Sequence, residues 1–228
     1  MPGTVWLFYF RMRPYRTLAY RRLKYSVSIS VGCATFYKLL YPRYHTPMSI
    51  KITYFVHGTT TDNEQHLSSG WNDVDLSEEG ISQSWELTEL TEHLKFDAVF
   101  CSDLKRAVDS AEIAWGGKYP IMQDARLREC NYGDLNGQSS DIVEPMQEKS
   151  ITEPMPNGES YEMVKVRIES FLQHLKTNFD NKHIAIVAHK APQLALEVIL
   201  NGMTWEEAFA NDWRKTKAWK PGWEYVLN

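Results

Sequence analysis

The sequence has few cysteines and no long apolar run. Its three cysteines, Cys33, Cys101 and Cys130, form no Cys-x-x-Cys pair, which argues against a disulfide framework and a structural zinc site. No stretch approaches the roughly 18 apolar residues of a membrane-spanning helix. The best candidate, residues 26–41, carries three serines and Lys38. These absences predict a chain without a membrane span, in a reducing compartment such as the cytoplasm.

Acidic residues are absent from the first 47 positions, which hold eight of the 25 Lys and Arg residues. Residues 48–228 contain the remaining 17 basic residues and all 29 acidic ones. This excess of negative charge argues against a nucleic-acid partner. The basic segment has the composition of an organelle transit peptide. The alternative, which we favour, is that Met48 is the true start. Either way we expect an N-terminal extension at residues 1–47 and one folded domain at residues 48–228.

From residue 51 onward, short apolar runs alternate with longer segments of helical periodicity. The expected strands span residues 52–56, 97–102, 183–189 and 223–227. The expected helices span residues 76–94, with Ser77 as N-cap, and residues 103–115, 161–175 and 192–200. Such alternation predicts a layered α/β fold with a mostly parallel sheet. Residues 133–158 contain three prolines and are expected to form an irregular loop or a small cap over the sheet.

A histidine lies at the carboxyl end of two of the expected strands. His57 follows residues 52–56, and His189 closes residues 183–189. A third strand is followed by Arg106, in the first turn of a helix whose N-terminal amides favour an anion. In parallel α/β sheets, ligands bind at the carboxyl ends of the strands. The pattern therefore predicts a phosphate pocket at this edge of the sheet.

Five ordered segments between residues 51 and 203 resemble the histidine phosphatase superfamily, in its phosphoglycerate-mutase-like branch. They correspond to the family's opening Arg-His-Gly signature, its Ser-x-Leu-x-Arg-Ala segment, its acid segment, its cap segment and its second-histidine segment. In this chain they read VHGTTTDNEQHLSSGWNDVDLSEEG, CSDLKRAVDSAEI, LRECNYGDLNG, NGESY and IAIVAHKAPQLAL. The resemblance implies a three-layer α/β/α sandwich of the phosphoglycerate mutase type.

The resemblance also implies a role for each matched polar residue. His57 would be the nucleophile that accepts the phosphoryl group, and Glu129 would be the proton donor, a role for which Asp134 and Glu159 compete. The other matched residues would bind the phosphate, and they are His189, Arg106, Asn63, Ser69 and Gly58. The resemblance implies no cofactor and no metal, because side chains alone would neutralise the phosphate.

These residue types suit phosphoryl transfer. A neutral imidazole is nucleophilic near neutral pH, since its ordinary pKa is about 6.5, and a phosphohistidine splits one difficult displacement into two easier ones. A carboxylic acid can protonate the leaving oxygen and then activate water, which typically contributes about 10²- to 10⁴-fold in rate.

The chain departs from the family pattern at two positions. Val56 stands where the signature has arginine, and Lys190 follows His189 where glycine is usual. We hypothesise that Lys190 supplies the missing positive charge, although a lysine lacks the bidentate geometry of a guanidinium.

We expect a phosphomonoester hydrolase that acts on a small phosphorylated substrate. One alternative is a mutase that returns the phosphoryl group to its substrate; the short segment at residues 137–158 favours hydrolysis, because mutases of this family usually carry larger insertions. The other alternative, suggested by Val56, is a weakly active or inactive member that binds a phosphorylated ligand or a protein.

Overall fold

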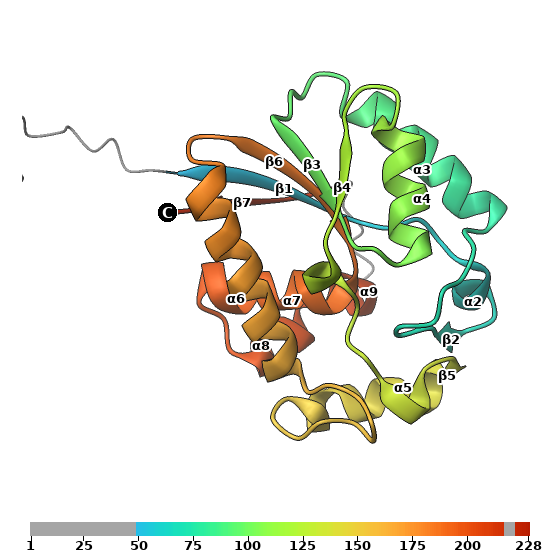
Figure 1. The fold of residues 1–228 in the computed structure, drawn as a ribbon. Helices are drawn as coiled ribbons and strands as arrows, with labels where there is room; N and C mark the ends of the chain where they lie inside the picture. Colours follow the sequence, from blue (N-terminus) through green and yellow to red (C-terminus); the bar gives the residue numbers. More distant parts are fainter. Residues whose placement is uncertain (1–48, 217–221) are drawn as a thin grey trace, which may run out of the picture. The chain divides into compact units, whose positions relative to one another are not determined.

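A computed structural model describes residues 49–216 and 222–228 of the chain; the extension expected at residues 1–47 lies outside this part. Within it, a five-stranded sheet has the order β4-β3-β6-β1-β7. Strands β1, β3, β4 and β6 are parallel, and β7 pairs antiparallel with β1 at the edge (Figure 1). The strands span Ile50–Val56 (β1), Ala98–Cys101 (β3), Ile121–Gln123 (β4), His183–Ala188 (β6) and Trp223–Leu227 (β7).

The sheet lies between two layers of helices. Side chains of β1, β3 and β6 alternate between two hydrophobic clusters, one shared with α3 and α4 and one shared with α6 and α7. The helices span Glu78–Leu90 (α3), Lys105–Trp115 (α4), Tyr161–Asn178 (α6) and Lys190–Asn201 (α7). Ser77 accepts the Gly80 N–H as the expected N-cap of α3. The predicted α/β/α sandwich with a mostly parallel sheet is confirmed.

The register of the central strands places two histidines side by side. Val56 of β1 lies opposite Ala188 of β6, and the His57 N–H donates to the Ala188 carbonyl at 3.1 Å. His57 and His189, the next residue on each strand, therefore leave the sheet at the same edge.

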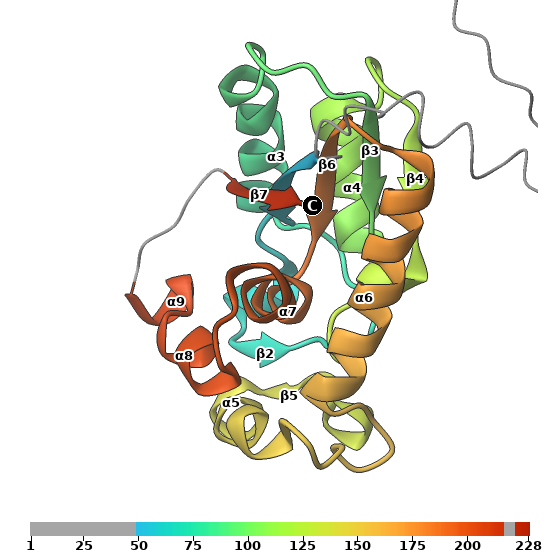
Figure 2. The ribbon, with the colours of Figure 1, turned by 90° about the vertical axis from the view of Figure 1, so that its left-hand side faces the viewer.

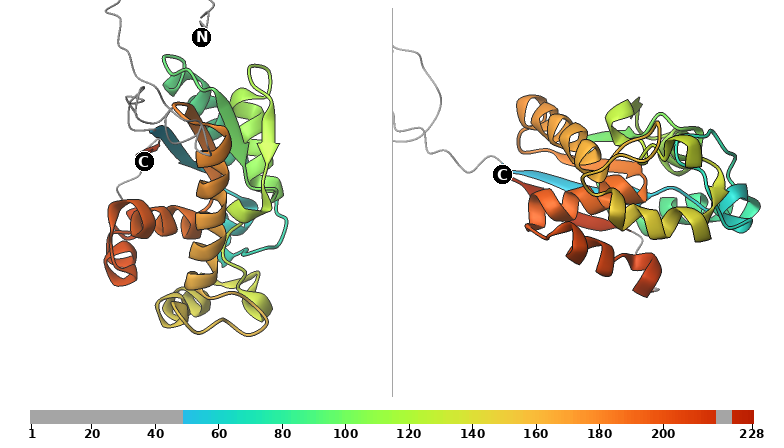
Figure 3. Two further views of the ribbon diagram at one scale, coloured as in Figure 1. Left: turned by 60° about the vertical axis from the view of Figure 1, so that its left-hand side comes forward. Right: turned by 90° about the horizontal axis from the view of Figure 1, so that it is seen from below.

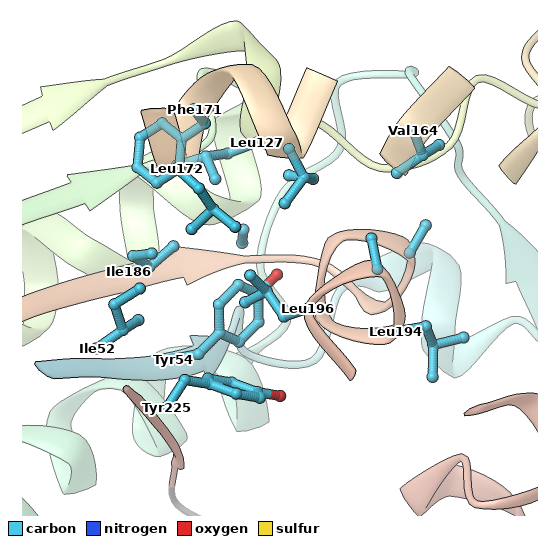
Figure 4. Packing of buried hydrophobic residues seen from close by; sticks show 14 of the residues in the cluster. Ile52, Tyr54, Leu127, Val164, Phe171, Leu172, Ile186, Leu194, Leu196 and Tyr225 are labelled. Carbon is cyan, nitrogen blue, oxygen red and sulfur yellow. The ribbon is translucent and has the colours of Figure 1, made fainter. Parts of the chain in front are cut away.

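A buried side chain of the core also fixes the backbone of the second histidine, His189. Tyr54 is fully buried among apolar side chains of α6 and α7 (Figure 4). Its hydroxyl donates to the His189 carbonyl at 2.6 Å and accepts the His189 N–H at 2.9 Å. One core side chain thus satisfies both backbone groups of His189 at the start of α7, where unpaired buried groups would be costly.

Residues 133–158 form a cap beyond the carboxyl ends of the strands (Figure 2). The expected irregular structure is wrong for residues 138–147, which contain β5 (Gln138–Ser139) and α5 (Ser140–Gln147). Strand β5 pairs with β2 (Leu67–Ser68), and α5 tolerates Pro145 in its interior. Proline disfavours a helix interior, but the Ser139 side chain caps α5 and Val143 is buried in the core. Packing thus overrides the propensity.

Three short helices complete the described part of the chain. They are α2 (Thr61–Glu64), α8 (Trp205–Ala210) and α9 (Trp213–Thr216). Helix α8 packs against α7, as both views of Figure 3 show in red and orange. Among the described residues, no helix combines the length and the apolar character needed to cross a membrane.

Candidate active site

A cavity of about 580 Å³ opens at the carboxyl ends of β1 and β6. Its walls come from the loop after β1, the first turn of α4, the cap and the segment after α8. Six of the eight site residues predicted from the sequence line it, namely His57, Asn63, Ser69, Arg106, Glu129 and Lys190. The topology therefore brings together residues that are up to 133 positions apart in the chain.

The His57 ring is held in one orientation. Its Nδ1–H donates to the Gly58 carbonyl at 2.7 Å, and the Arg106 Nε–H donates to His57 Nε2 at 3.2 Å. A carbonyl only accepts, so Nδ1 carries the proton and Nε2 offers its lone pair. Burial, together with the positive charge of Arg106, lowers the pKa of His57 to about 3. The imidazole is therefore neutral at physiological pH, as a nucleophile requires.

The Arg106 guanidinium is fixed by backbone carbonyls. Its NH1 donates to Asn72 O at 3.0 Å and its NH2 donates to Gly70 O at 2.7 Å. Gly70 has a φ of +54°, and a Cβ there would lie 1.8 Å from the Asn136 side chain, so only glycine fits this turn. The buried guanidinium is thus a preorganised positive charge beside His57.

His189 is fully buried, and its ring centroid lies 5.0 Å from that of His57. Among the described residues, neither of its ring nitrogens has a hydrogen-bond partner. Burial, with the nearby charge of Arg106, lowers the pKa of His189 well below its usual value, so the ring is neutral. Buried polar atoms are normally paired, and a ligand oxygen next to His57 would supply a partner.

The Glu129 carboxylate lies at the N-terminus of α7. It accepts the N–H groups of Cys130 at 2.8 Å, Lys190 at 3.2 Å and Ala191 at 3.0 Å. These donors hold a buried carboxylate at the cavity wall. The α7 amides thus position an internal carboxyl group, whereas the charge beside His57 comes from the Arg106 side chain.

The two competing acids lie elsewhere. Glu159 forms an ion pair with Arg167, with Oε1 and Nε 3.0 Å apart, and Asp134 accepts from the Asn157 amide near the surface. Neither belongs to the cavity lining. Of these three acidic residues, Glu129 is therefore the one that lines the cavity beside His57. In the described residues, no group of three His, Cys, Asp or Glu side chains could hold a metal ion.

Gly58, predicted to bind the phosphate, does not belong to the cavity lining. The Gly58 N–H donates to the buried Ser110 hydroxyl at 3.0 Å, while its carbonyl orients His57. A Cβ at this position would lie 2.4 Å from the Gly80 carbonyl oxygen, so the loop after β1 packs directly on the α3 backbone. These contacts place His57, and a phosphate contact of Gly58 stays a prediction.

Asn63 and Ser69 line the cavity with their side chains partly engaged. The Asn63 Oδ1 accepts the Thr60 N–H at 3.0 Å in the capping box of α2. The Ser69 hydroxyl donates to Asp62 Oδ2 at 2.8 Å. Both residues therefore shape the cavity wall; a phosphate contact would need the Asn63 amide nitrogen or a rotated Ser69 hydroxyl.

The Lys190 ammonium points into the protein. It contacts the Gln147 Oε1 of the cap and lies 3.6 Å from Asp212 Oδ2. Burial, with the nearby charge of Arg214, lowers the pKa of Lys190 to about 8. The positive charge that the sequence suggested for the phosphate is thus already paired with a carboxylate.

Two charged residues of the cavity lining were missed from the sequence. Glu144 comes from α5 of the cap and Arg214 from α9, and they form an ion pair at 3.2 Å. Neither belongs to a recognisable motif, and they are 70 positions apart. Only contacts between the cap and the C-terminal segment bring them to the site.

The chain belongs to the histidine phosphatase superfamily (branch 1), whose sequence model matches residues 54–224. A 2,3-bisphosphoglycerate-dependent phosphoglycerate mutase of Bartonella tribocorum is 32% identical over 68% of this chain and 84% of its own length. An uncharacterized phosphatase of Bacillus subtilis, PhoE, is 32% identical over 64% of this chain and 75% of its own length.

A solved structure gives the same fold. The alpha-ribazole phosphatase from Shigella flexneri matches with a TM-score of 0.62 and 26% identity, over 70% of this chain and 84% of that one. Relatives of this family thus include both phosphatases and mutases, and phosphorylated small molecules are typical substrates of the family.

Proposed function

We propose that this protein is a phosphomonoester hydrolase that works through a phosphohistidine at His57. The observation that carries the proposal is the arrangement around His57 Nε2. This nitrogen is unprotonated in the neutral ring, lies 3.2 Å from Arg106 Nε, and lines the large cavity. The nearby His189 ring has no hydrogen-bond partner in the described part of the chain. A phosphoryl group bound here would meet a nucleophile, a fixed cation and a neutral donor.

The reaction divides into two displacements. In the first, His57 Nε2 bonds to phosphorus, the bond between phosphorus and the leaving oxygen breaks, and protonated Glu129 gives its proton to that oxygen. In the second, water attacks phosphorus, its proton passes to Glu129, and the bond between nitrogen and phosphorus breaks to release inorganic phosphate. Arg106 and His189 stabilise the charge on the transferring oxygens, where the loss of one donor typically costs about 10²- to 10³-fold.

Val56 is the feature that sets this chain apart from the family signature. It lines the cavity next to His57 and occupies the position of the signature arginine. Loss of one charge-assisted hydrogen bond weakens phosphate binding by about 1.5 to 3 kcal/mol. We therefore expect weaker phosphate binding than a family member with the complete signature, unless another cation compensates.

A mutase is the second candidate. Its support is the similarity to the phosphoglycerate mutase of Bartonella tribocorum, and its chemistry would use the same phosphohistidine. The short segment at residues 137–158 favours hydrolysis, because mutases of this family usually carry larger insertions. A weakly active ligand-binding protein is the third candidate, supported by Val56.

One set of assays separates these functions. The protein is incubated with p-nitrophenyl phosphate, and acid-labile phosphorylation and release of inorganic phosphate are measured; 3-phosphoglycerate is supplied separately. We expect hydrolysis and a phosphohistidine that disappears in His57→Gln but persists in His174→Gln, whose histidine lies away from the cavity on α6. Formation of 2-phosphoglycerate as the main reaction would establish the mutase, and the absence of phosphorylation and turnover in both assays would leave only the binding protein.

A further inference from the structure

Among the described residues, two cations besides Arg106 line the cavity, and they differ in how firmly they are held. The Lys190 side chain is 6% exposed and its partner Asp212 is 1% exposed. Separating a buried ion pair carries a large penalty. Lys190 also contacts Gln147, so its ammonium has little freedom to turn toward a phosphate at His57.

Arg214 is held more loosely on the same wall. Its side chain is 40% exposed and its NH2 lies 3.2 Å from Glu144 Oε1, a partner that is 46% exposed. Exposed ion pairs contribute little to stability, so exchanging Glu144 for a substrate oxyanion costs little. The buried Asp212 carboxylate, which also pairs with Lys190, accepts from Arg214 Nε at 3.4 Å and NH2 at 3.3 Å, and it would keep the guanidinium near the cavity during this exchange.

The charge of Arg214 also acts on the nucleophile. It is one of the two positive charges, after that of Arg106, that contribute to the lowered pKa of His57. Both side chains line the same cavity, so the guanidinium lies within electrostatic reach of the imidazole. The negative charge of a phosphoryl group on His57 would therefore be attracted by the positive charge of Arg214.

We propose that Arg214 binds the phosphoryl group transferred to His57 and supplies the positive charge that Val56 does not. The inference rests on the proposed function and names the residue that completes its phosphate site. A guanidinium can bind two phosphate oxygens with parallel N–H donors, a geometry that the ammonium of Lys190 lacks. The cation would thus reach the phosphate from α9.

The test compares Arg214→Gln with Lys215→Gln. Lys215 is the next residue, pairs with Glu148 at 2.8 Å, and lines only a neighbouring cavity. The dissociation constant of inorganic phosphate and kcat/KM for p-nitrophenyl phosphate are measured with the full chain. We expect Arg214→Gln to weaken phosphate binding about 10- to 100-fold and to lower kcat/KM by a similar factor, with Lys215→Gln close to wild type.

A rescue variant distinguishes binding from a structural role. Val56→Arg in the Arg214→Gln background should restore most of the lost phosphate affinity, whereas a merely structural defect would persist. If the Val56→Arg protein does not fold, Arg214→Lys takes its place, and it should retain more phosphate affinity than Arg214→Gln. Equal phosphate affinity in Arg214→Gln and Lys215→Gln would overturn the inference, as would an effect limited to substrates that carry a second anionic group.

The outcomes separate this inference from the proposed function. Hydrolysis by the wild type with an unaffected Arg214→Gln variant refutes only the role of Arg214. Phosphate binding that depends on Arg214, in a wild type without turnover, refutes only the hydrolase. A wild type that neither binds phosphate nor turns over substrate refutes both.

Discussion

Replacing His57 with glutamine should make the protein's stability less sensitive to mild acid. The structure lowers the pKa of His57 from 6.5 to about 3, through burial first and the charge of Arg106 second. Below about pH 6.5 the unfolded chain therefore takes up a proton at this position that the folded chain does not. The contribution of His57 disfavours folding progressively as the pH falls from 6.5 toward 3. Glutamine cannot take up this proton.

The size of the effect follows from the two pKa values. Each pH unit in this window costs about 1.4 kcal/mol, and about pH 5 lies about 1.5 units below the unfolded pKa. The wild type should therefore lose about 2 kcal/mol of unfolding free energy between about pH 8 and pH 5 that His57→Gln does not lose. His189, whose pKa is also lowered, chiefly by burial and the charge of Arg106, is present in both proteins, so these main causes are shared in the comparison.

Urea unfolding followed by tryptophan fluorescence at the two pH values measures this difference. His93→Gln, which removes an exposed histidine, is the matched control and should follow the wild type. If the unfolding free energies of wild type and His57→Gln fall in parallel between the two pH values, then burial and Arg106 do not hold this imidazole neutral. The account of His57 as a neutral nucleophile would then be wrong.

Two further predictions concern the groups that hold His57. Arg106→Gln removes the fixed cation beside His57 Nε2, and kcat/KM for p-nitrophenyl phosphate should fall by about 10²- to 10³-fold; an unchanged value would exclude Arg106 from the phosphate site. Ser110→Ala removes the buried acceptor of the Gly58 N–H and should lower the unfolding free energy by about 1 to 3 kcal/mol. Urea denaturation measures the second change, and a neutral result would show that another group satisfies this N–H.

Much of the fold could be predicted because its signals are local. The expected strand at residues 223–227 matches β7, and the expected strands at residues 52–56 and 183–189 match β1 and β6 to within two residues. Alternating or continuous apolar runs and capping residues are properties of neighbouring positions. The helix α5 was missed because Pro145 disfavours a helix locally, whereas the buried Val143 stabilises it through distant contacts.

The part of the site that lies at the ends of the strands could be predicted from the sequence. His57 and His189 follow two paired parallel strands, so the register alone makes them neighbours. Arg106 joins them because its helix follows the next strand, β3, on the other side of β6. The positions of these three residues follow from the order of strands and helices along the chain, which can be predicted from the sequence pattern.

The sequence by itself determined the histidine at the strand end, its partner histidine and the nearby arginine, since short-range patterns set where each strand stops. Only the tertiary structure decided which other charges reach them. It paired Lys190 with Asp212, turned the Gly58 amide toward Ser110, and brought Arg214 to the cavity. The physical reason is that a charge is neutralised by whatever partner lies within a few ångströms, and such partners come from segments that no local pattern connects.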